Sequence, residues 1–303
     1  MELKWLEDYL TLVDTRNFTR SAELRFTTQP AFSRRIRSLE EWIGTTLIER
    51  ATQPVSLTAA GLKFRPAAEE LLRRLYQARE DIRHLDNASA NTISFAATHS
   101  LSLNFFPRWI HSMENKGLLF TRLESNRMEN CVQELQKAHV HFMLCHAHSS
   151  VDFHLPADTF SAISVGKDRL LPVSVPDDQG APVHTLSSTR ERPAHYLAYA
   201  GTSAIGRAVD HLLENCADKV HLEQVFVTDL AAVLLSMVRA GRGLAWLPES
   251  VAMDDLEKGT LVVAGDGRWV VPVEISLFRL KEGLPPKAEE FWSAVVASQS
   301  DGA

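Results

Sequence analysis

The sequence predicts an α/β protein with an N-terminal bundle of short helices, one long helix and a larger domain of alternating strands and helices. Three observations lead to this prediction. Apolar residues near the N-terminus recur at spacings of three and four, as on amphipathic helices. A seven-residue apolar repeat follows between residues 58 and 85. From residue 93 onward, extended apolar runs alternate with helical patterns, which is typical of α/β domains.

Three short helices are expected before residue 44. The first spans Leu3–Asp14, the second spans Thr19–Arg25, and the third opens at Thr28 and ends near Trp42. Thr28 can act as its N-cap, and Pro30 lies in its first turn, where a missing N–H is no loss. The tight turn between the second and third helices predicts a helix-turn-helix pair.

The third helix has one apolar seam and one polar face. Ile36, Leu39 and Ile43 recur at spacings of three and four and are expected in the core. The other face carries side chains that can pair with base edges, thymine methyl groups or phosphates, as in a DNA groove. These are Thr28, Gln29, Pro30, Ser33, Arg34 and Arg37. The alternative is an amphipathic hairpin whose basic face is simply solvated.

A short hairpin, or wing, is expected from Gly44 to Leu57. Arg50 near its base can reach a phosphate, and Gln53 at its tip can reach the minor groove. Both residues can equally be solvated turn residues.

Thr58 is expected to cap a long helix that runs to about Leu85. Such a helix with an apolar seam needs a partner, and a dimer is favoured over packing on its own domain. Pro66 interrupts the pattern, so the helix either bends or restarts there. The seam consists of Phe64, Ala68, Leu71, Leu75, Ala78, Ile82 and Leu85.

The polar stretch Asn87–Thr92 separates this helix from an α/β domain in which a mostly parallel sheet is expected. The predicted strands are Ile93–Ala97, Leu119–Glu124, His141–Cys145, Leu170–Val175, Tyr196–Tyr199, Gln224–Val227 and Gly243–Leu247, with strand-like runs at Leu261–Val263 and Val270–Leu277. The predicted helices are Leu101–Met113, Met128–Lys137, Ala204–Glu214, Leu230–Ala240 and Lys287–Ala297.

The run TTQPAFSRRIRSLEEWIGTTLIERATQPVSLTAAG resembles the winged helix-turn-helix signature of the LysR-type transcriptional regulators. The matching positions are Gln29, Pro30, Ser33, Arg34, Ile36, Leu39, Glu40, Gly44, Leu47, Arg50, Leu57, Thr58, Ala60 and Gly61. The run VRAGRGLAWLPES resembles a glycine-containing run in the family's effector domain. Its GxG precedes a strand rather than opening a helix, so it is not a dinucleotide loop.

This resemblance covers nearly the whole chain and implies its domain organisation. Residues 1–58 would form a winged helix-turn-helix domain, 59–88 a dimerising linker helix, and 89–303 a periplasmic-binding-protein-like effector domain. The latter would comprise two α/β subdomains, subdomain I at about 89–164 and 267–303 and subdomain II at about 165–266.

The resemblance also implies partners. They are double-stranded promoter or operator DNA, further copies of the chain as a homo-oligomer, and a small-molecule effector or an oxidant; RNA polymerase can be a further partner. Residues 1–65 hold ten Lys/Arg and eight Asp/Glu, a net charge of +2. Because the whole chain has a net charge of −6, the remaining residues carry −8. DNA binding would therefore depend on a locally basic helix and wing and on dimerisation.

Hydroxyl and amide residues precede several helices of the larger domain, where helix N-termini offer free N–H groups at a cleft. Together they predict a small polar or anionic effector, although each alone can be an ordinary helix cap. They are Thr98, His99, Ser100, Ser102, Ser125, Asn126, Thr202, Ser203 and Thr228.

Within the family, the segments KWLEDYLTL, QPAFSRRIRSLE, AATHSLSLNFFP and GLAWLPES resemble the hypochlorite-responsive regulators. That resemblance implies sensing by methionine oxidation, with Met113 as the candidate residue. Ile205 and Leu230 depart from the pattern, and the six methionines can also be ordinary core residues. The alternative is a regulator that responds to an anionic or aromatic metabolite.

Other function classes lack their motifs. The chain has no GxSxG elbow, Walker loop, HExxH or paired CxxC, so it is not expected to be an enzyme or to hold a cofactor. His139, His141, His146, His148 and His154 crowd one segment with Cys145, but alternate residues of a strand point apart, and no metal is predicted.

Cysteine content and hydropathy indicate the cellular compartment of the protein. Cys131, Cys145 and Cys216 are odd in number and widely spaced, which does not favour a disulfide framework. No run of eighteen apolar residues and no signal peptide pattern occurs. A cytoplasmic protein without a membrane partner is expected.

Overall fold

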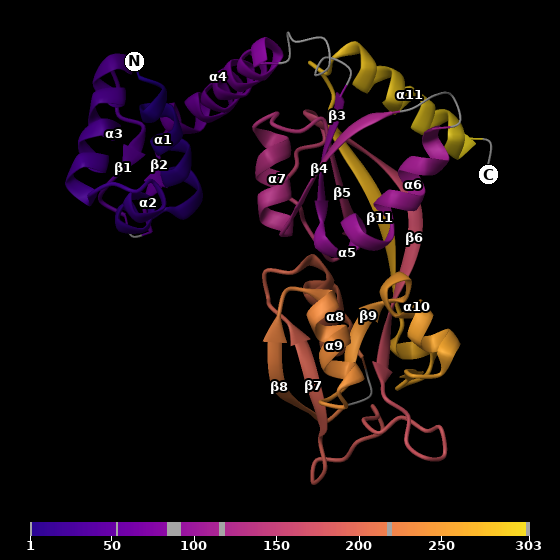
Figure 1. Cartoon of the computed structure of the whole chain (residues 1–303). Helices are drawn as coiled ribbons and strands as arrows, with labels where there is room; N and C mark the ends of the chain where they lie inside the picture. The colour runs from indigo at the N-terminus through magenta and orange to yellow at the C-terminus, as the bar shows by residue number, and fades with distance from the viewer. Residues whose placement is uncertain (1, 53, 84–91, 115–118, 217–219, 301–303) are drawn as a thin grey trace. The chain divides into compact units, whose positions relative to one another are not determined.

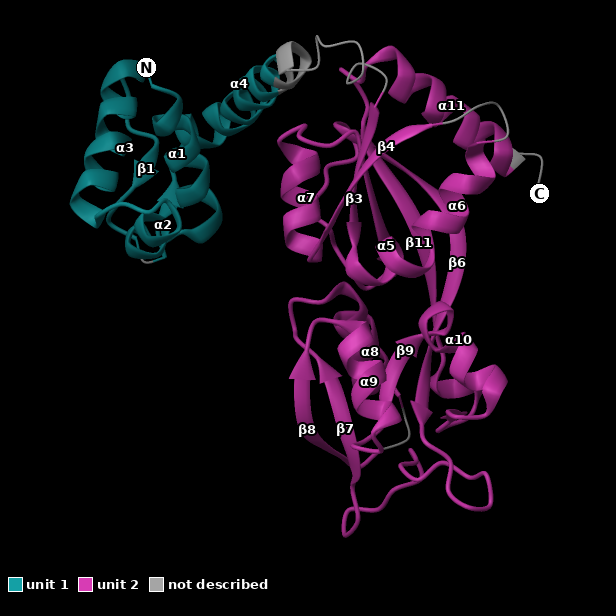
Figure 2. Ribbon diagram, viewed as in Figure 1, with its two compact units in different colours: residues 1–85 teal, residues 86–303 magenta. Residues whose placement is uncertain are grey.

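The computed structural model describes residues 2–52, 54–83, 92–114, 119–216 and 220–300 (Figure 1). The chain forms two compact units, residues 1–85 and 86–303 (Figure 2). In the described part of the chain, no helix combines the length and the hydropathy needed to cross a bilayer.

The first unit packs short helices around one small core. Tyr9, Phe32, Ile36 and Leu39 are fully buried there, which confirms the apolar seam predicted for the third helix. The Thr28 hydroxyl accepts a hydrogen bond from the backbone N–H of Ala31, so the predicted N-cap is also confirmed. The elements are α1 (Leu3–Thr15), α2 (Phe18–Leu24), α3 (Gln29–Ile43), β1 (Ile48–Glu49), β2 (Ser56–Leu57) and α4 (Ala59–Arg83).

The wing is a minimal antiparallel hairpin of β1 and β2. The buried carboxylate of Glu40 anchors it by accepting hydrogen bonds from the backbone N–H groups of Leu47 and Ile48, at 2.9 and 3.1 Å. Gly61 packs against the same segment, where a Cβ would stand 2.2 Å from the carbonyl oxygen of Leu47. The wing is therefore fixed to α3 and α4 by buried contacts.

Helix α4 is continuous through Pro66, and Thr58 caps it by accepting a hydrogen bond from Gly61 N–H at 3.0 Å. The predicted seam does not lie on one face. Ala68 is buried against the unit's own core together with Leu72, whereas Leu71 and Leu75 are each 48% exposed. The prediction that the whole seam packs against a partner helix was therefore wrong for Ala68. Leu85 and the side chain of Ile82 lie outside the described residues.

The second unit begins with a sheet covered on both faces. In β5, Phe142 and Leu144 face one core and Met143 and Cys145 the other, which confirms the predicted alternation. Helices α6 and α11 cover the first face and α7 the second (Figure 1). The elements are β3 (Thr92–Thr98), α5 (His99–Asn104), α6 (Phe106–Met113), β4 (Phe120–Asn126), α7 (Met128–Gln136), β5 (Phe142–Ala147), β11 (Val271–Leu280) and α11 (Pro286–Ser300).

The rest of the unit has a core of its own around Trp246, Leu234 and Leu247. Its elements are β6 (Phe160–Ser174), β7 (Ala194–Tyr199), α8 (Ala204–Asn215), β8 (Leu222–Thr228), α9 (Ala231–Arg239), β9 (Ala245–Pro248), α10 (Glu249–Lys258), β10 (Val262–Val263) and the 3-10 turn η2 (Gly267–Trp269).

The large sheet is not mostly parallel, contrary to the prediction. Its strand order is β10-β6-β11-β5-β3-β4, with β9 also paired to β6, and only the pairs of β3 with β4 and β5 are parallel. The long strands β6 and β11 pair antiparallel. The predicted strand Leu170–Val175 covers only the end of β6. The first part of β6 contains several polar residues and does not form a continuous apolar run.

Two helical predictions also need correction. The expected helix Leu101–Met113 is broken at Phe105 into α5 and α6, where Pro107 starts a new first turn. Helix α10 was missed because Pro248 at its start and its polar sequence read as a loop. Both errors concern short helices, which tertiary packing stabilises more than local propensity does.

Candidate functional site

The polar face of α3 is the first candidate site. Gln29, Pro30, Arg34 and Arg37 are exposed, and Ser33 is half-buried. Within the residues that the structure describes, the guanidinium groups of Arg34 and Arg37 have no protein partner. Arg35, by contrast, forms an ion pair with the buried Asp8 at 3.2 Å. Two arginines on one face of the helix are thus left available to an external anion.

Of the two residues predicted in the wing, Arg50 has a partner within the protein. The guanidinium of Arg50 bonds the Glu40 carboxylate at 2.5 Å, so part of this group is already engaged in holding the wing. Gln53 lies outside the described residues.

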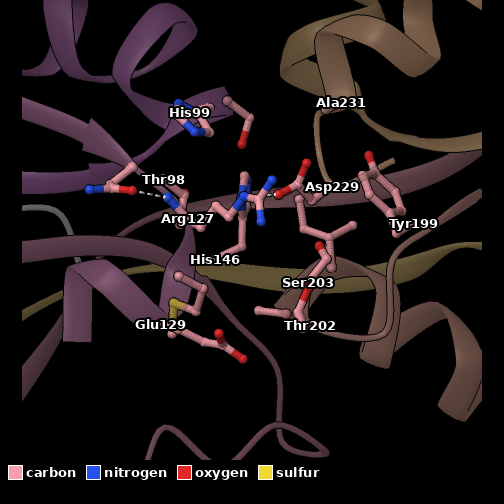
Figure 3. Close-up of a pocket in the computed structure, with 15 residues that line it drawn as sticks. Thr98, His99, Arg127, Glu129, His146, Tyr199, Thr202, Ser203, Asp229 and Ala231 are labelled. Atoms are coloured by element: carbon pink, nitrogen blue, oxygen red, sulfur yellow. Dashed lines mark hydrogen bonds and ion pairs between the residues drawn. The ribbon is translucent and has the colours of Figure 1, made fainter. Parts of the chain in front are cut away.

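The second candidate site is a cavity in the 86–303 unit, and its walls come from both halves of that unit (Figure 3). Six of the nine predicted effector residues line it: Thr98, His99, Ser100, Asn126, Thr202 and Ser203. Arg127, Met128, Glu129, His146, Tyr199, Ala204, Ile205, Asp229 and Ala231 complete the wall.

The three other predicted residues do not line the cavity. Ser125 lies behind His99, bonded to its Nδ1 at 2.8 Å and to the Ser102 hydroxyl at 2.7 Å. The Thr228 hydroxyl accepts a hydrogen bond from the backbone N–H of Leu230. All three support the wall or cap the backbone instead, because their polar atoms already have partners within the protein.

Four helices begin at the cavity. His99, Met128, Ala204 and Ala231 are the first residues of α5, α7, α8 and α9, and all four line the wall. Of these helices only α8 has a side-chain cap, since the Ser203 hydroxyl accepts a hydrogen bond from the Gly206 N–H at 3.3 Å. The N-terminal N–H groups of α7 and α9 lack side-chain caps, and such groups favour a negatively charged ligand.

An ion pair crosses the cavity. Arg127, between β4 and α7, contacts the carboxylate of Asp229, between β8 and α9. Figure 3 shows these two side chains reaching toward each other from opposite sides. Neither residue was predicted from the sequence, where the candidates were mainly hydroxyl and amide side chains. Both are charged residues directly before a predicted helix, and that position was the signal that could have identified them.

Several polar atoms of the wall are buried and unsatisfied. Among the described residues, Thr98 Oγ1, His146 Nδ1 and Tyr199 OH have no hydrogen-bond partner, and Asp229 Oδ2 has none beyond its ion pair. Native proteins leave few such atoms, and a cluster of them marks a place for water or a ligand. The cavity is therefore built for a polar occupant.

His146 is held by a buried carboxylate. Its Nε2 lies 3.2 Å from Oδ2 of Asp168 on β6, and the same oxygen accepts a 2.6 Å hydrogen bond from the Ser250 hydroxyl on α10. Burial raises the pKa of Asp168, but the hydrogen bonds from His146 and Ser250 outweigh it and hold that pKa below its ordinary value. Burial raises the pKa of Tyr199, so its hydroxyl stays protonated.

The redox and metal candidates lie apart from this cavity. Met113 is half-buried against the core of the first sheet face. Cys131 and Cys145 are buried, and burial raises the pKa of Cys131 to about 12. The clustered histidines have separate partners, such as Glu134 for His139 and Asp152 for His154. No group of three or more metal-binding side chains forms within the described part of the chain.

Comparisons with known proteins agree with the resemblance noted in the sequence. Residues 3–62 match the bacterial regulatory helix-turn-helix protein of the lysR family, and residues 86–300 match the LysR substrate binding domain. The chain is 32% identical over 295 residues to the HTH-type transcriptional regulator YjiE of Escherichia coli K12, covering 96% of this chain and 93% of that protein.

Two solved structures span nearly the whole chain. Vibrio fischeri DarR in complex with DNA has 31% identity and a TM-score of 0.59, covering 97% of this chain and 98% of its own. Full-length HypT of Salmonella typhimurium, a hypochlorite-specific LysR-type regulator, has 29% identity and a TM-score of 0.61, covering 99% of each chain. These relatives are regulators and not enzymes. The chain therefore belongs to the LysR family of bacterial DNA-binding transcriptional regulators.

Proposed function

We propose that this regulator binds operator DNA through the outer face of α3 and that a small ligand with an anionic group controls it from the cavity of the 86–303 unit. One observation carries the ligand proposal. Helix N-termini, an arginine and buried polar atoms without hydrogen-bond partners converge in one cavity. Orphaned polar groups are costly to bury, so a ligand that satisfies them gains affinity.

Charge and exposure support the DNA proposal. Arg34 and Arg37 are exposed, lack partners within the described residues and lie three positions apart on one helix. Side chains so spaced share a face, and an arginine fork matches phosphate oxygens or the guanine edge. Gln29, Pro30 and Ser33 stand on the first turns of the same helix, next to Thr28 as its cap. Arg50 and Gln53 of the wing would add backbone or minor-groove contacts.

The organisation proposed for the chain follows the family. Residues 1–58 would bind DNA, 59–88 would pair the copies of a homo-oligomer, and 89–303 would bind the effector. The two subdomains would meet near Val165, where the pairing of β6 with β11 shifts register.

The replacement Arg34→Ala tests the DNA face. We expect it to abolish specific binding to the protein's upstream intergenic DNA, because each good contact of this kind contributes about 1–3 kcal/mol and both copies of a dimer lose it. Binding is measured by gel shift, and folding by circular dichroism. Arg108→Ala, an exposed arginine of the other unit, is the matched control and should bind normally. Wild-type affinity in Arg34→Ala would refute the assignment.

An oxidant is the second candidate effector, and one observation favours it. HypT, similar over the full length of this chain, is named as hypochlorite-specific. Met113 is half-buried, so an oxidant can reach it more easily than the buried Cys131 and Cys145.

One experiment separates the oxidant from a bound ligand. DNA binding is measured before and after brief hypochlorite treatment, and again after incubation with methionine sulfoxide reductase. Oxidant control predicts a change in affinity or footprint that the reductase reverses and that Met113→Leu removes. Ligand control predicts identical binding in all three states, together with a response to small carboxylates.

A further inference from the structure

We infer that the ligand of the cavity is a small zwitterion that carries an ammonium group beside a carboxylate, as an α-amino acid does. This inference rests on the proposed function, since it names the chemical class of the ligand that would occupy the same cavity. It follows from which atoms of the wall are unsatisfied and from the charges beside them.

With its imidazole neutral, His146 presents a hydrogen-bond acceptor. The Asp168 carboxylate also receives hydrogen bonds from the Ser250 hydroxyl and from the backbone N–H of Arg169, so it acts as an acceptor. The nitrogen of His146 that faces it, Nε2, must therefore carry a proton. In the neutral imidazole this leaves Nδ1 with a lone pair, and Nδ1 is the buried atom without a partner among the described residues. A ligand N–H would satisfy it.

Asp229 presents a second acceptor, with a negative charge. Its side chain is only 16% exposed, and Oδ2 contacts the Arg127 guanidinium without receiving an aligned hydrogen bond within the described residues. A ligand with an anionic group alone would meet repulsion from this carboxylate and would leave both acceptors unsatisfied. An ammonium group removes both penalties.

The remaining groups of the wall suit a carboxylate. The hydroxyls of Thr98 and Tyr199 lack partners within the described residues and can donate. The uncapped N-termini of α7 and α9 add backbone N–H groups. Arg127 can turn from Asp229 to a ligand carboxylate. Donors and acceptors thus divide into two sets that match the two ends of a zwitterion.

Without a ligand, Arg127 and Asp229 neutralise each other's charge, as the two ends of a zwitterion would. The two residues come from opposite halves of the cavity, one before α7 and the other before α9 (Figure 3). A zwitterion between them would replace one charge contact by two, its carboxylate facing Arg127 and its ammonium facing Asp229. The two halves of the cavity would then be connected through the charged groups of the ligand instead of through a direct ion pair.

The size of the cavity limits the ligand. The space that the centre of a water-sized molecule can reach is about 50 Å³. Since one water needs roughly 10–15 Å³ of such space, this volume corresponds to a few waters or a ligand of similar bulk. Glycine and alanine are the natural probes.

The test compares four probes: two carry both charged groups, one carries only the carboxylate and one carries only the ammonium group. Binding of glycine, L-alanine, propionate and ethylamine to the full-length protein is measured by titration calorimetry. We expect glycine or alanine to bind more tightly than propionate or ethylamine, by a factor of about ten or more. Propionate lacks the ammonium group and ethylamine lacks the carboxylate, so each loses a hydrogen bond between charged groups.

Two matched variants assign the ammonium site. Asp229→Asn should lower the affinity for the amino acid about tenfold or more and should leave propionate binding unchanged or stronger. Asp178→Asn makes the same chemical change at an exposed carboxylate outside the cavity and should alter neither affinity.

Each outcome decides between the proposals. Propionate that binds as tightly as the amino acids, or Asp229→Asn that weakens both equally, would overturn the zwitterion while an anion-controlled regulator stands. If none of the four probes binds the wild type, the zwitterion and the proposed effector cavity both fail. The comparison of probes on the wild type needs no variant to fold.

Discussion

At the residue scale, neighbours of the same type have different roles that only their contacts distinguish. Arg34 and Arg35 are adjacent on α3, yet Arg35 pairs with the buried Asp8 and Arg34 faces outward. Asp168 and Asp229 also differ. Asp168 has four hydrogen-bonding contacts, with His146, with the backbone N–H of Arg169, and with the hydroxyl and backbone N–H of Ser250, and it fixes His146. The Asp229 Oδ2 contacts Arg127 but receives no aligned hydrogen bond within the described residues. The first carboxylate supports the cavity, and the second is the one that the proposed ligand would meet.

Asp168 gives a pH-dependent prediction. Its pKa is held below the ordinary 3.8, so its contribution to stability is present above that value and is lost as pH falls through the lower folded-state pKa. Asp168→Asn should therefore lower the free energy of unfolding near neutral pH, and the difference from wild type should shrink as the solution is acidified below pH 3.8. Urea unfolding followed by tryptophan fluorescence measures it.

The exposed Asp152→Asn is the control for that series, since its surface ion pair with His154 contributes little. A constant difference between Asp168→Asn and wild type at all pH values would contradict the lowered pKa.

The candidate site was partly predictable at this scale. The sequence located Thr98, Asn126 and Ser203 because polar residues before helices have a local signature. It could not find His146 or Tyr199. Both lie at the carboxyl ends of buried strands, and their position at the cavity depends on which strands end beside one another. Ser125 was placed in the site for the same local reason, but its hydroxyl is used by His99 and Ser102.

At the element scale, α4 divides its apolar residues between two surfaces. Ala68 and Leu72 pack on the core of their own unit, while Leu71, Leu75 and Ala78 are exposed along an adjacent face. The heptad pattern alone could not separate these surfaces, because residues three and four apart fall on neighbouring rather than identical lines of the helix. Leu71 and Leu75 are the part of the seam that suits a second copy of the helix.

The double replacement Leu71→Glu with Leu75→Glu tests that face. Four charged side chains in a paired interface should dissociate the oligomer, because buried charges without partners are costly. Sedimentation velocity should then show monomers, with circular dichroism unchanged. Leu62→Glu alters a 63% exposed leucine two and a half turns from Leu71 and should leave the oligomer intact. An oligomer that survives the double replacement would exclude this face as the interface.

At the scale of the whole molecule, the proposed regulation requires two DNA-binding units and the proposed effector domain in one assembly. LysR regulators bind DNA as oligomers, and the DNA complex of DarR spans nearly the same length of chain. The acidity of residues 66–303 and the small positive charge of residues 1–65 mean that one copy offers only a local basic surface. Two copies would have to act together on one operator.

Pairing predicts a dependence on the spacing between half-sites. Inserting about 5 bp between the two halves of the operator turns one half to the opposite side of the duplex, and affinity should fall by about tenfold or more. Inserting about 10 bp restores the same side and should recover part of the affinity. Gel shifts with the three operators measure this. Equal affinity for all of them would mean that each copy binds independently.

The sequence by itself determined the family, the caps of α3 and α4, the seam of α3 and the order of most strands and helices. These features rest on spacings of two to seven residues, which a linear chain displays directly. Only the tertiary structure decided that β6 and β11 pair antiparallel, that Leu71 is exposed where Ala68 is buried, and that Arg127 meets Asp229 across a cavity. Those facts depend on residues far apart in the sequence, about a hundred positions for Arg127 and Asp229, and such contacts are set by how the sheet and helices pack rather than by any local pattern.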